Sequence, residues 1–184
     1  MKQHIKTLIA GGVLALVLIG MAMRGPLEDG YAAYQRGDYA KVMRLFRPLA
    51  DQGNATAQNN LGVMYRDGSG VSRDYAQAFA WFRKSADLGN ATAQNNLGVM
   101  YSDGSGVSQD YAQALEWYRK AADQGEATAL FNLGVMYDNR RGASQDYAQA
   151  FAWYRKAADL GNANAQSIGG LIQGEVSHNE SCIA

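Results

Sequence analysis

Residues 54–89 decide the fold, and they read NATAQNNLGVMYRDGSGVSRDYAQAFAWFRKSADLG. Residues 90–125 match this segment at 29 of 36 positions without a gap, and residues 126–161 repeat it again at the same spacing. A fixed period of this length is typical of a solenoid, in which each unit packs only on its neighbours. The sequence therefore predicts three full repeats, at 54–89, 90–125 and 126–161.

Each repeat shows the helical period twice. In its first half, apolar side chains recur at positions i, i+4, i+7 and i+8, namely Ala57, Leu61, Met64 and Tyr65. In its second half, Asp74 can cap a helix whose broad aromatic face includes Trp81 and Phe82, and Gly89 follows at the end. Small residues of the first helix should let those large rings approach. We expect an all-α chain: a right-handed α-solenoid of antiparallel helix pairs with a 36-residue period.

The repeat frame extends beyond the three full units. Asp38-Tyr39-Ala40 stands one period before Asp74-Tyr75-Ala76, so residues 27–53 form a shortened first repeat. After Gly161, residues 162–174 open a further unit that stops after one helix. The remaining residues, 175–184, form a polar tail.

Two departures from the repeat predict local distortions. Pro48 falls inside the second helix of the shortened repeat, where it removes one backbone hydrogen bond and should kink or open that helix. Arg140 stands where Gly68 and Gly104 stand in the earlier repeats. If that position needs a positive φ, Arg140 is strained there.

The first residues form a separate unit, 1–22. Lys2 and Lys6 precede an uncharged apolar run at 7–23, and Gly20-Met21-Ala22 supplies small residues for a signal peptidase. This order predicts a secretory signal peptide, a mature chain that begins at Met23, and a periplasmic or secreted location. The alternative is an uncleaved anchor in the inner membrane, with residues 7–23 as the only membrane contact.

The composition limits the possible chemistry. Lys plus Arg and Asp plus Glu both number 17, which argues against binding to nucleic acid or to anionic lipid through charge. His4, His178 and Cys182 all lie near the chain ends, so the repeats contain no histidine or cysteine for catalysis or metal binding. The aspartates that recur at 74, 110 and 146 are explained as helix caps. We expect no catalytic site, no metal and no cofactor, and the sequence assigns no role to Cys182.

The repeated spacings carry a family resemblance. They are A-x-x-x-L-G-x-x-Y, then G-x-G-V, D-Y-A-x-A, W-Y-R-K-A-A and a closing glycine. Over about residues 31–161 the chain resembles the Sel-one-like repeat family, a relative of the tetratricopeptide repeat. The resemblance implies an α-solenoid that serves as an adaptor or scaffold for other proteins. Many bacterial members are exported and take part in envelope processes or host contact.

The resemblance also implies a binding surface, because first helices line the concave side of the similar tetratricopeptide array. A stripe opposite the core face of each first helix should then face the groove. Its residues, named here the first-helix stripe, are Thr56, Asn59, Val63, Arg66, Thr92, Asn95, Val99, Ser102, Thr128, Phe131, Val135 and Asp138. Side-chain amides along a groove can bond an extended peptide backbone. The alternative is that tandem duplication simply copied these residues.

One stripe residue breaks the copy. Phe131 replaces the asparagine found at Asn59 and Asn95. An exposed aromatic in a groove is a typical hot spot for binding. The alternative is that Phe131 turns inward and packs on the altered loop at Arg140.

The resulting functional hypothesis is an exported, non-catalytic scaffold that binds a protein or peptide partner through its concave groove. Two alternatives stay open. Some bacterial members of the family are cysteine-rich and have been linked to β-lactam hydrolysis, but their paired cysteines are missing from this chain. A third reading is an effector that is delivered into a host or rival cell and acts there by binding a protein.

Overall fold

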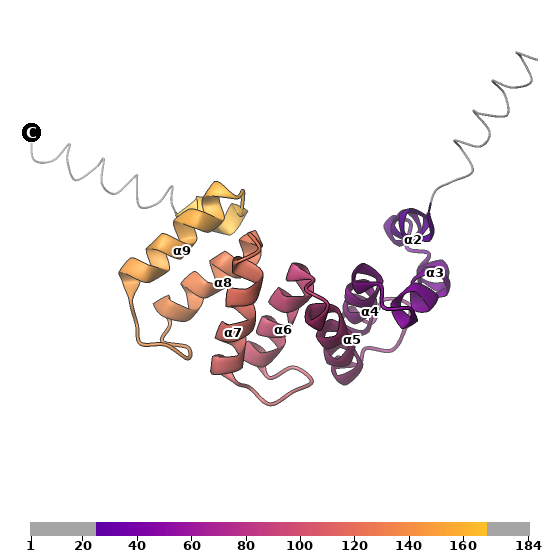
Figure 1. Cartoon of the computed structure of the whole chain (residues 1–184), viewed down its shortest axis with the longest axis horizontal. Helices are drawn as coiled ribbons and strands as arrows, with labels where there is room; N and C mark the ends of the chain where they lie inside the picture. The colour runs from indigo at the N-terminus through magenta and orange to yellow at the C-terminus, as the bar shows by residue number, and fades with distance from the viewer. Residues whose placement is uncertain (1–24, 169–184) are drawn as a thin grey trace, which may run out of the picture.

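The computed structural model of the chain describes residues 25–168. Within that span the regular elements are all helices, which follow one another along an arc (Figure 1). Those with defined bounds are α2 (Pro26–Gln35), α3 (Tyr39–Asp51), α4 (Ala55–Asp67), α5 (Tyr75–Asp87), α6 (Ala91–Asp103), α7 (Tyr111–Ala122), α8 (Ala127–Asp138) and α9 (Tyr147–Asp159). Residues 163–168 are also helical and begin the unit that follows α9. The prediction of an all-α solenoid with a period of 36 residues is confirmed.

Consecutive helices pack in pairs, one pair to each repeat: α2 with α3, α4 with α5, α6 with α7 and α8 with α9. In each full repeat a glycine of the first helix lies against an aromatic ring of the second. A Cβ on Gly62 would lie 2.5 Å from Cδ1 of Phe82, and one on Gly98 would lie 2.5 Å from Cδ1 of Tyr118. Because a real Cβ never comes this close, only glycine lets the two helices meet at this distance. The predicted pairing of small residues with large rings is confirmed.

Side-chain caps fix the start of the helices. Asp74 Oδ1 accepts a hydrogen bond from the backbone N–H of Gln77 at 3.0 Å. Asn54 Oδ1 does the same for Ala57 at 2.9 Å. In the third full repeat, Glu126 takes the place of the asparagine as the N-cap of α8. These bonds satisfy N–H groups that have no partner inside the helix.

The loop between α8 and α9 follows the same backbone path as the matching loops of the earlier repeats, although Arg140 replaces their glycine. Gly68 ends α4 with φ of +72°, and Arg140 adopts φ of +57° at the matching position. Arg141 N still donates to Met136 O at 3.0 Å, as the matching residues do in the two earlier repeats. Arg140 is the one non-glycine residue with positive φ in the span 25–168, which confirms the strain predicted there.

The predicted opening of the helix at Pro48 is wrong, whereas a kink there stays a prediction. Helix α3 runs unbroken from Tyr39 to Asp51 and includes Pro48. Pro48 lies in the last turn, and both it and Arg44, whose carbonyl loses its donor, are exposed. Water can therefore bond that carbonyl, and one missing bond near a helix end is tolerated.

Buried side chains form successive clusters along the arc. The largest fully buried side chains of these clusters include Phe46, Leu61, Phe82 and Leu97, which come from successive helix pairs. Between residues 25 and 168, no helix has the length and apolar character that crossing a bilayer requires. The predicted signal segment, its cleavage site before Met23 and the polar tail lie outside the described residues.

Candidate functional site

The first-helix stripe runs along α4, α6 and α8. Thr92 and Thr128 are exposed, whereas Asn95 and Ser102 are buried, each with 7% of its surface exposed. The other members are half-buried: Thr56, Asn59, Val63, Arg66, Val99, Phe131, Val135 and Asp138. Most side chains of the stripe thus contact neighbouring helices with one part of their surface and solvent with the rest.

Asparagine side chains join the first helices to one another. Asn96 Nδ2 of α6 donates to Asn59 Oδ1 of α4 at 3.1 Å. One repeat later, Asn132 Nδ2 of α8 donates to Asn95 Oδ1 of α6 at 2.9 Å. We name these bonded asparagines (Asn59, Asn96, Asn95 and Asn132) the asparagine ladder. The second asparagine of each pair was not predicted as a site residue, although the repeated Asn-Asn dipeptide was a usable signal.

The ladder leaves particular groups free to bind. In the part of the chain that the structure describes, the Nδ2 groups of Asn59 and Asn95 donate to no protein acceptor. Neither nitrogen is sealed from solvent. Because each amide oxygen is held by the neighbouring helix, these N–H groups are oriented before any ligand arrives.

The asparagine ladder does not continue past Asn132. Phe131 stands where Asn59 and Asn95 stand in the earlier repeats. Ile168 stands one period after Asn132, so an apolar residue replaces the next amide donor as well. Both Phe131 and Ile168 pack against the cluster that contains Tyr154. The rings of Phe131 and Tyr154 are 5.4 Å apart between centroids. Phe131 therefore turns inward toward α9, in a cluster that also includes Ala143 of the loop that contains Arg140.

A pocket of about 410 Å³ lies where α4 and α6 end. Its lining combines charges of both signs with apolar surface: Arg66, Asp67, Arg73, Tyr75, Val99, Met100, Asp103 and Ser105. Arg66 Nε donates to Asp67 Oδ1 at 2.7 Å, and this hydrogen bond is the main reason that the pKa of Arg66 is raised. Arg66 Nη1 also lies 3.4 Å from Asn96 Oδ1, which connects the pocket to the asparagine ladder.

No group of three or more His, Cys, Asp or Glu side chains between residues 25 and 168 could hold a metal ion. Burial, with a smaller effect from Asp138, raises the pKa of Tyr154 to about 12. Its hydroxyl therefore stays protonated and donates to Asp138 Oδ2 at 3.3 Å. What the surface presents is a set of hydrogen-bond donors and acceptors between apolar side chains.

A sequence profile of the Sel1 repeat matches residues 55–90, 91–126 and 127–162. The chain belongs to the Sel1 repeat family. Each matched Sel1 repeat starts one residue after a repeat predicted from the sequence. Proteins with Sel1 repeats generally use them as scaffolds for contacts between proteins. None of the curated proteins compared with the chain matches it.

Solved structures share this Sel1 architecture. A Sel1 repeat protein from Oxalobacter formigenes is 37% identical, with a TM-score of 0.73, over 78% of this chain and 59% of its own. A protective antigen of uropathogenic Escherichia coli with an SLR fold is 39% identical, with a TM-score of 0.71, over 82% of this chain and 34% of its own. Cysteine rich protein B of Helicobacter pylori shares the fold, with a TM-score of 0.52 and 20% identity. The match covers 77% of this chain and 95% of that protein. The match thus spans about three fifths of the length of the first protein and about one third of the length of the second.

Proposed function

We propose that this chain is an exported Sel1-repeat scaffold that binds an extended segment of a partner protein along its first-helix stripe, without catalysis. The observation that carries the proposal is the asparagine ladder. Its free Nδ2 groups, on Asn59 and Asn95, belong to neighbouring helices and can donate to successive carbonyls of an extended backbone. Holding the donors in place beforehand lowers the entropy cost of binding.

The pocket at the ends of α4 and α6 extends this surface. Arg66 and Arg73 can bond carboxylates or carbonyls, while Asp67 and Asp103 can accept from N–H groups. Such a surface recognises the backbone and the polar side chains of a peptide with little demand on its sequence. Phe131 packs on α9 and therefore contributes less to the groove than an exposed aromatic would.

The test is partner capture by matched variants. The immobilised chain is incubated with an envelope extract, and the retained proteins are identified by mass spectrometry. Asn59→Ala and Asn95→Ala should each lower the yield of the retained partner, whereas Glu116→Ala, an exposed change on α7, should not. If the two asparagine variants retain the partner as fully as the parent chain does, the stripe is not the binding surface.

Export rests on the order of residues 1–22. We expect N-terminal sequencing of protein recovered from the periplasm or the medium to begin at Met23. A secreted form that begins at Met1 would contradict this, and an intact chain in the membrane fraction would favour the anchor. The same secreted protein should not turn over a chromogenic β-lactam, and turnover above that of an empty-vector preparation would overturn the non-catalytic assignment.

A further inference from the structure

Three equivalent junctions connect successive repeats, and each is built from a second helix, the next first helix and the next second helix. Junction A joins α3, α4 and α5; junction B joins α5, α6 and α7; junction C joins α7, α8 and α9. Matching residues of these junctions are 36 positions apart. They can therefore be compared side chain by side chain.

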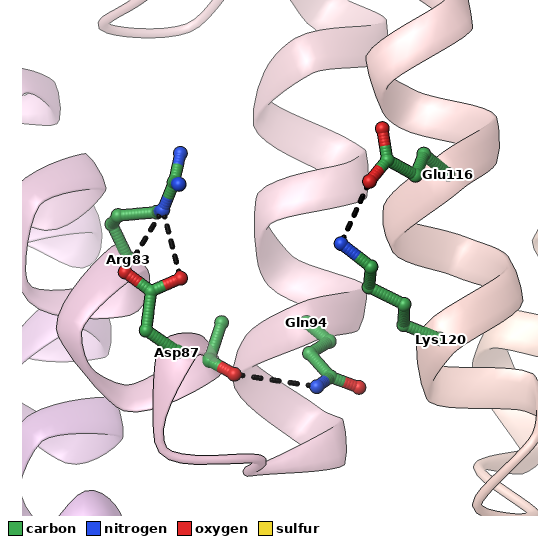
Figure 2. A network of polar contacts seen from close by, with 6 residues as sticks. Arg83, Asp87, Gln94, Glu116 and Lys120 are labelled. Carbon is green, nitrogen blue, oxygen red and sulfur yellow. Dashed lines mark hydrogen bonds and ion pairs between the residues drawn. The ribbon is translucent and has the colours of Figure 1, made fainter.

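Junction B is closed by a polar network. Arg83 Nε donates to both carboxylate oxygens of Asp87, at 3.0 and 3.1 Å, while its guanidinium lies 5.2 Å from the ring centroid of Trp117. Gln94 Nε2 donates to the carbonyl of Ala86 at 3.3 Å, and Gln94 Oε1 accepts from Gln124 Nε2 at 2.7 Å. Figure 2 shows the pair of Arg83 with Asp87 and the bond from Gln94 to the backbone.

Junction A repeats the arginine arrangement. Arg47 Nε lies 3.2 Å from Asp51 Oδ2, and the guanidinium of Arg47 lies 5.2 Å from the ring centroid of Trp81. At both junctions, then, an arginine of the preceding helix covers a tryptophan and is held by the aspartate one turn after it. This is a cation–π contact combined with a charge-assisted hydrogen bond.

Junction C has the same tryptophan and aspartate but lacks the arginine between them. Arg119, the matching residue, instead donates from Nη2 to Tyr137 Oη at 2.9 Å. Within residues 25–168, Asp123 therefore has no side-chain partner, and no guanidinium lies over Trp153. At junction C neither of the two groups that hold a guanidinium at junctions A and B has one, although the ammonium of Lys156 lies over the Trp153 ring.

Two further residues distinguish junction C from junction B. Leu130 replaces Gln94 and Leu160 replaces Gln124, so the amide pair of junction B becomes a pair of leucines. A pocket of about 370 Å³ lies at this junction. Its lining, named here the junction C pocket, is Ala122, Asp123, Gly125, Leu130, Trp153, Lys156, Asp159 and Leu160.

We propose that the junction C pocket binds the arginine side chain of a partner protein. The guanidinium stacks on Trp153 and donates to Asp123, in the arrangement that Arg83 makes within the chain at junction B. The aliphatic stem of the arginine lies against Leu130 and Leu160. Asp159 supplies a second carboxylate at the rim.

The charges of the pocket favour a cation. Two aspartates face one lysine, Lys156, whose Nζ lies 4.5 Å from the ring centroid of Trp153. This lysine does not exclude an arginine. At junction B the matching Lys120 lies 4.2 Å from the Trp117 centroid while Arg83 occupies its place over the same ring.

Residues 169–184 contain neither arginine nor lysine, so they do not supply this arginine. The pocket shares no residue with the first-helix stripe. Binding at the pocket therefore stands or fails independently of binding along the stripe.

The test uses the whole chain and two synthetic tripeptides, acetyl-Gly-Arg-Gly-amide and its citrulline counterpart, which has the same shape without the charge. The readout is the NMR signal of the Trp153 indole N–H, assigned with Trp153→Phe; the signals of Trp81 and Trp117 serve as internal controls. We expect saturable shifts of the Trp153 signal with the arginine peptide. The citrulline peptide should bind about tenfold more weakly, because it loses the cation–π contact and the ionic hydrogen bond.

Variants locate the site. Asp123→Asn should weaken the arginine peptide roughly fivefold to tenfold, and its matched control at junction B, Asp87→Asn, should leave binding unchanged. The double variant Leu130→Gln with Leu160→Gln restores the junction B amides and should close the pocket. Equal binding of the two peptides, or unchanged binding by Asp123→Asn, would overturn the proposal. So would binding that occurs only in Arg119→Ala, since Arg119 would then fill the pocket itself.

Discussion

Replacing Leu88 with glutamine should raise the stability of the chain. At junction A, Gln58 Nε2 donates to the carbonyl of Ala50 at 2.9 Å, so the orientation of its amide is fixed. Gln58 Oε1 is buried and accepts no hydrogen bond from the residues that the structure describes. At junction B the same oxygen, on Gln94, accepts from Gln124, and Leu88 stands where Gln124 stands. Leu88→Gln therefore supplies the missing donor.

The magnitude follows from three terms. A buried acceptor without a partner costs about 1–3 kcal/mol. Ordering a glutamine side chain that stays partly exposed offsets about 1 kcal/mol of this. Leu88 is 57% exposed, so its removal gives up few buried contacts. The net gain should be about 1 kcal/mol, which corresponds to a rise in Tm of roughly 3 °C for a chain of this size.

Urea and thermal unfolding followed by circular dichroism measure the effect, with Leu160→Gln as the matched control. Leu160 faces Leu130, which has no acceptor, so that variant should gain nothing. In a Gln58→Leu background the gain from Leu88→Gln should also vanish, because the oxygen that needs the donor is gone. An equal gain in that background, or from Leu160→Gln, would refute the reasoning.

Further expected outcomes concern packing. Trp117→Ala should lower the free energy of unfolding by about 3–5 kcal/mol, because this side chain is only 5% exposed. Glu116→Ala, on the exposed side of α7, should change it little. Equal melting temperatures of the two variants would contradict the burial of Trp117. Gly106→Ala should destabilise the chain in thermal unfolding, because its Cβ would lie 2.5 Å from the carbonyl carbon of Tyr75 and φ there is +72°. Phe131→Ala should cost about 2–3 kcal/mol by the same measurement, since this ring is half-buried, and unchanged stability would place it in the groove instead.

The parts of the fold that depend on local chemistry could be predicted from the sequence. Asp74 and Asn54 cap helices because short polar side chains reach the free N–H groups of the first turn, wherever the rest of the chain lies. The positive φ at Arg140 could be predicted because two glycines occupy its position in the other repeats. Whether Pro48 opens its helix could not be predicted, because the cost depends on whether water reaches the carbonyl of Arg44, which the sequence does not show.

The contacts between repeats could not be predicted in the same way. Gln94 and Gln124 are 30 residues apart, a distance set by how α6 and the end of α7 meet, and no local rule connects them. The ladder partner of Asn59 is likewise Asn96 rather than the residue one period on, because each bond crosses between helices at an offset of 37. The stripe residues lie on α4, α6 and α8, but which of their atoms remain free depends on these crossings.

Substitutions that distinguish one repeat from its copies are informative only when their partners are considered. Phe131 and Ile168 both stand where earlier repeats have asparagine, and both pack on one cluster. Leu130 and Leu160 stand where Gln94 and Gln124 stand at junction B, but the carboxylate of Asp123 and the ring of Trp153 persist beside them without the arginine that these groups hold elsewhere in the chain. The change of the first pair, Phe131 and Ile168, thus alters the packing around Tyr154. The second pair removes a network while keeping the groups that recognise a guanidinium, which is why a binding role is assigned to junction C rather than to Phe131.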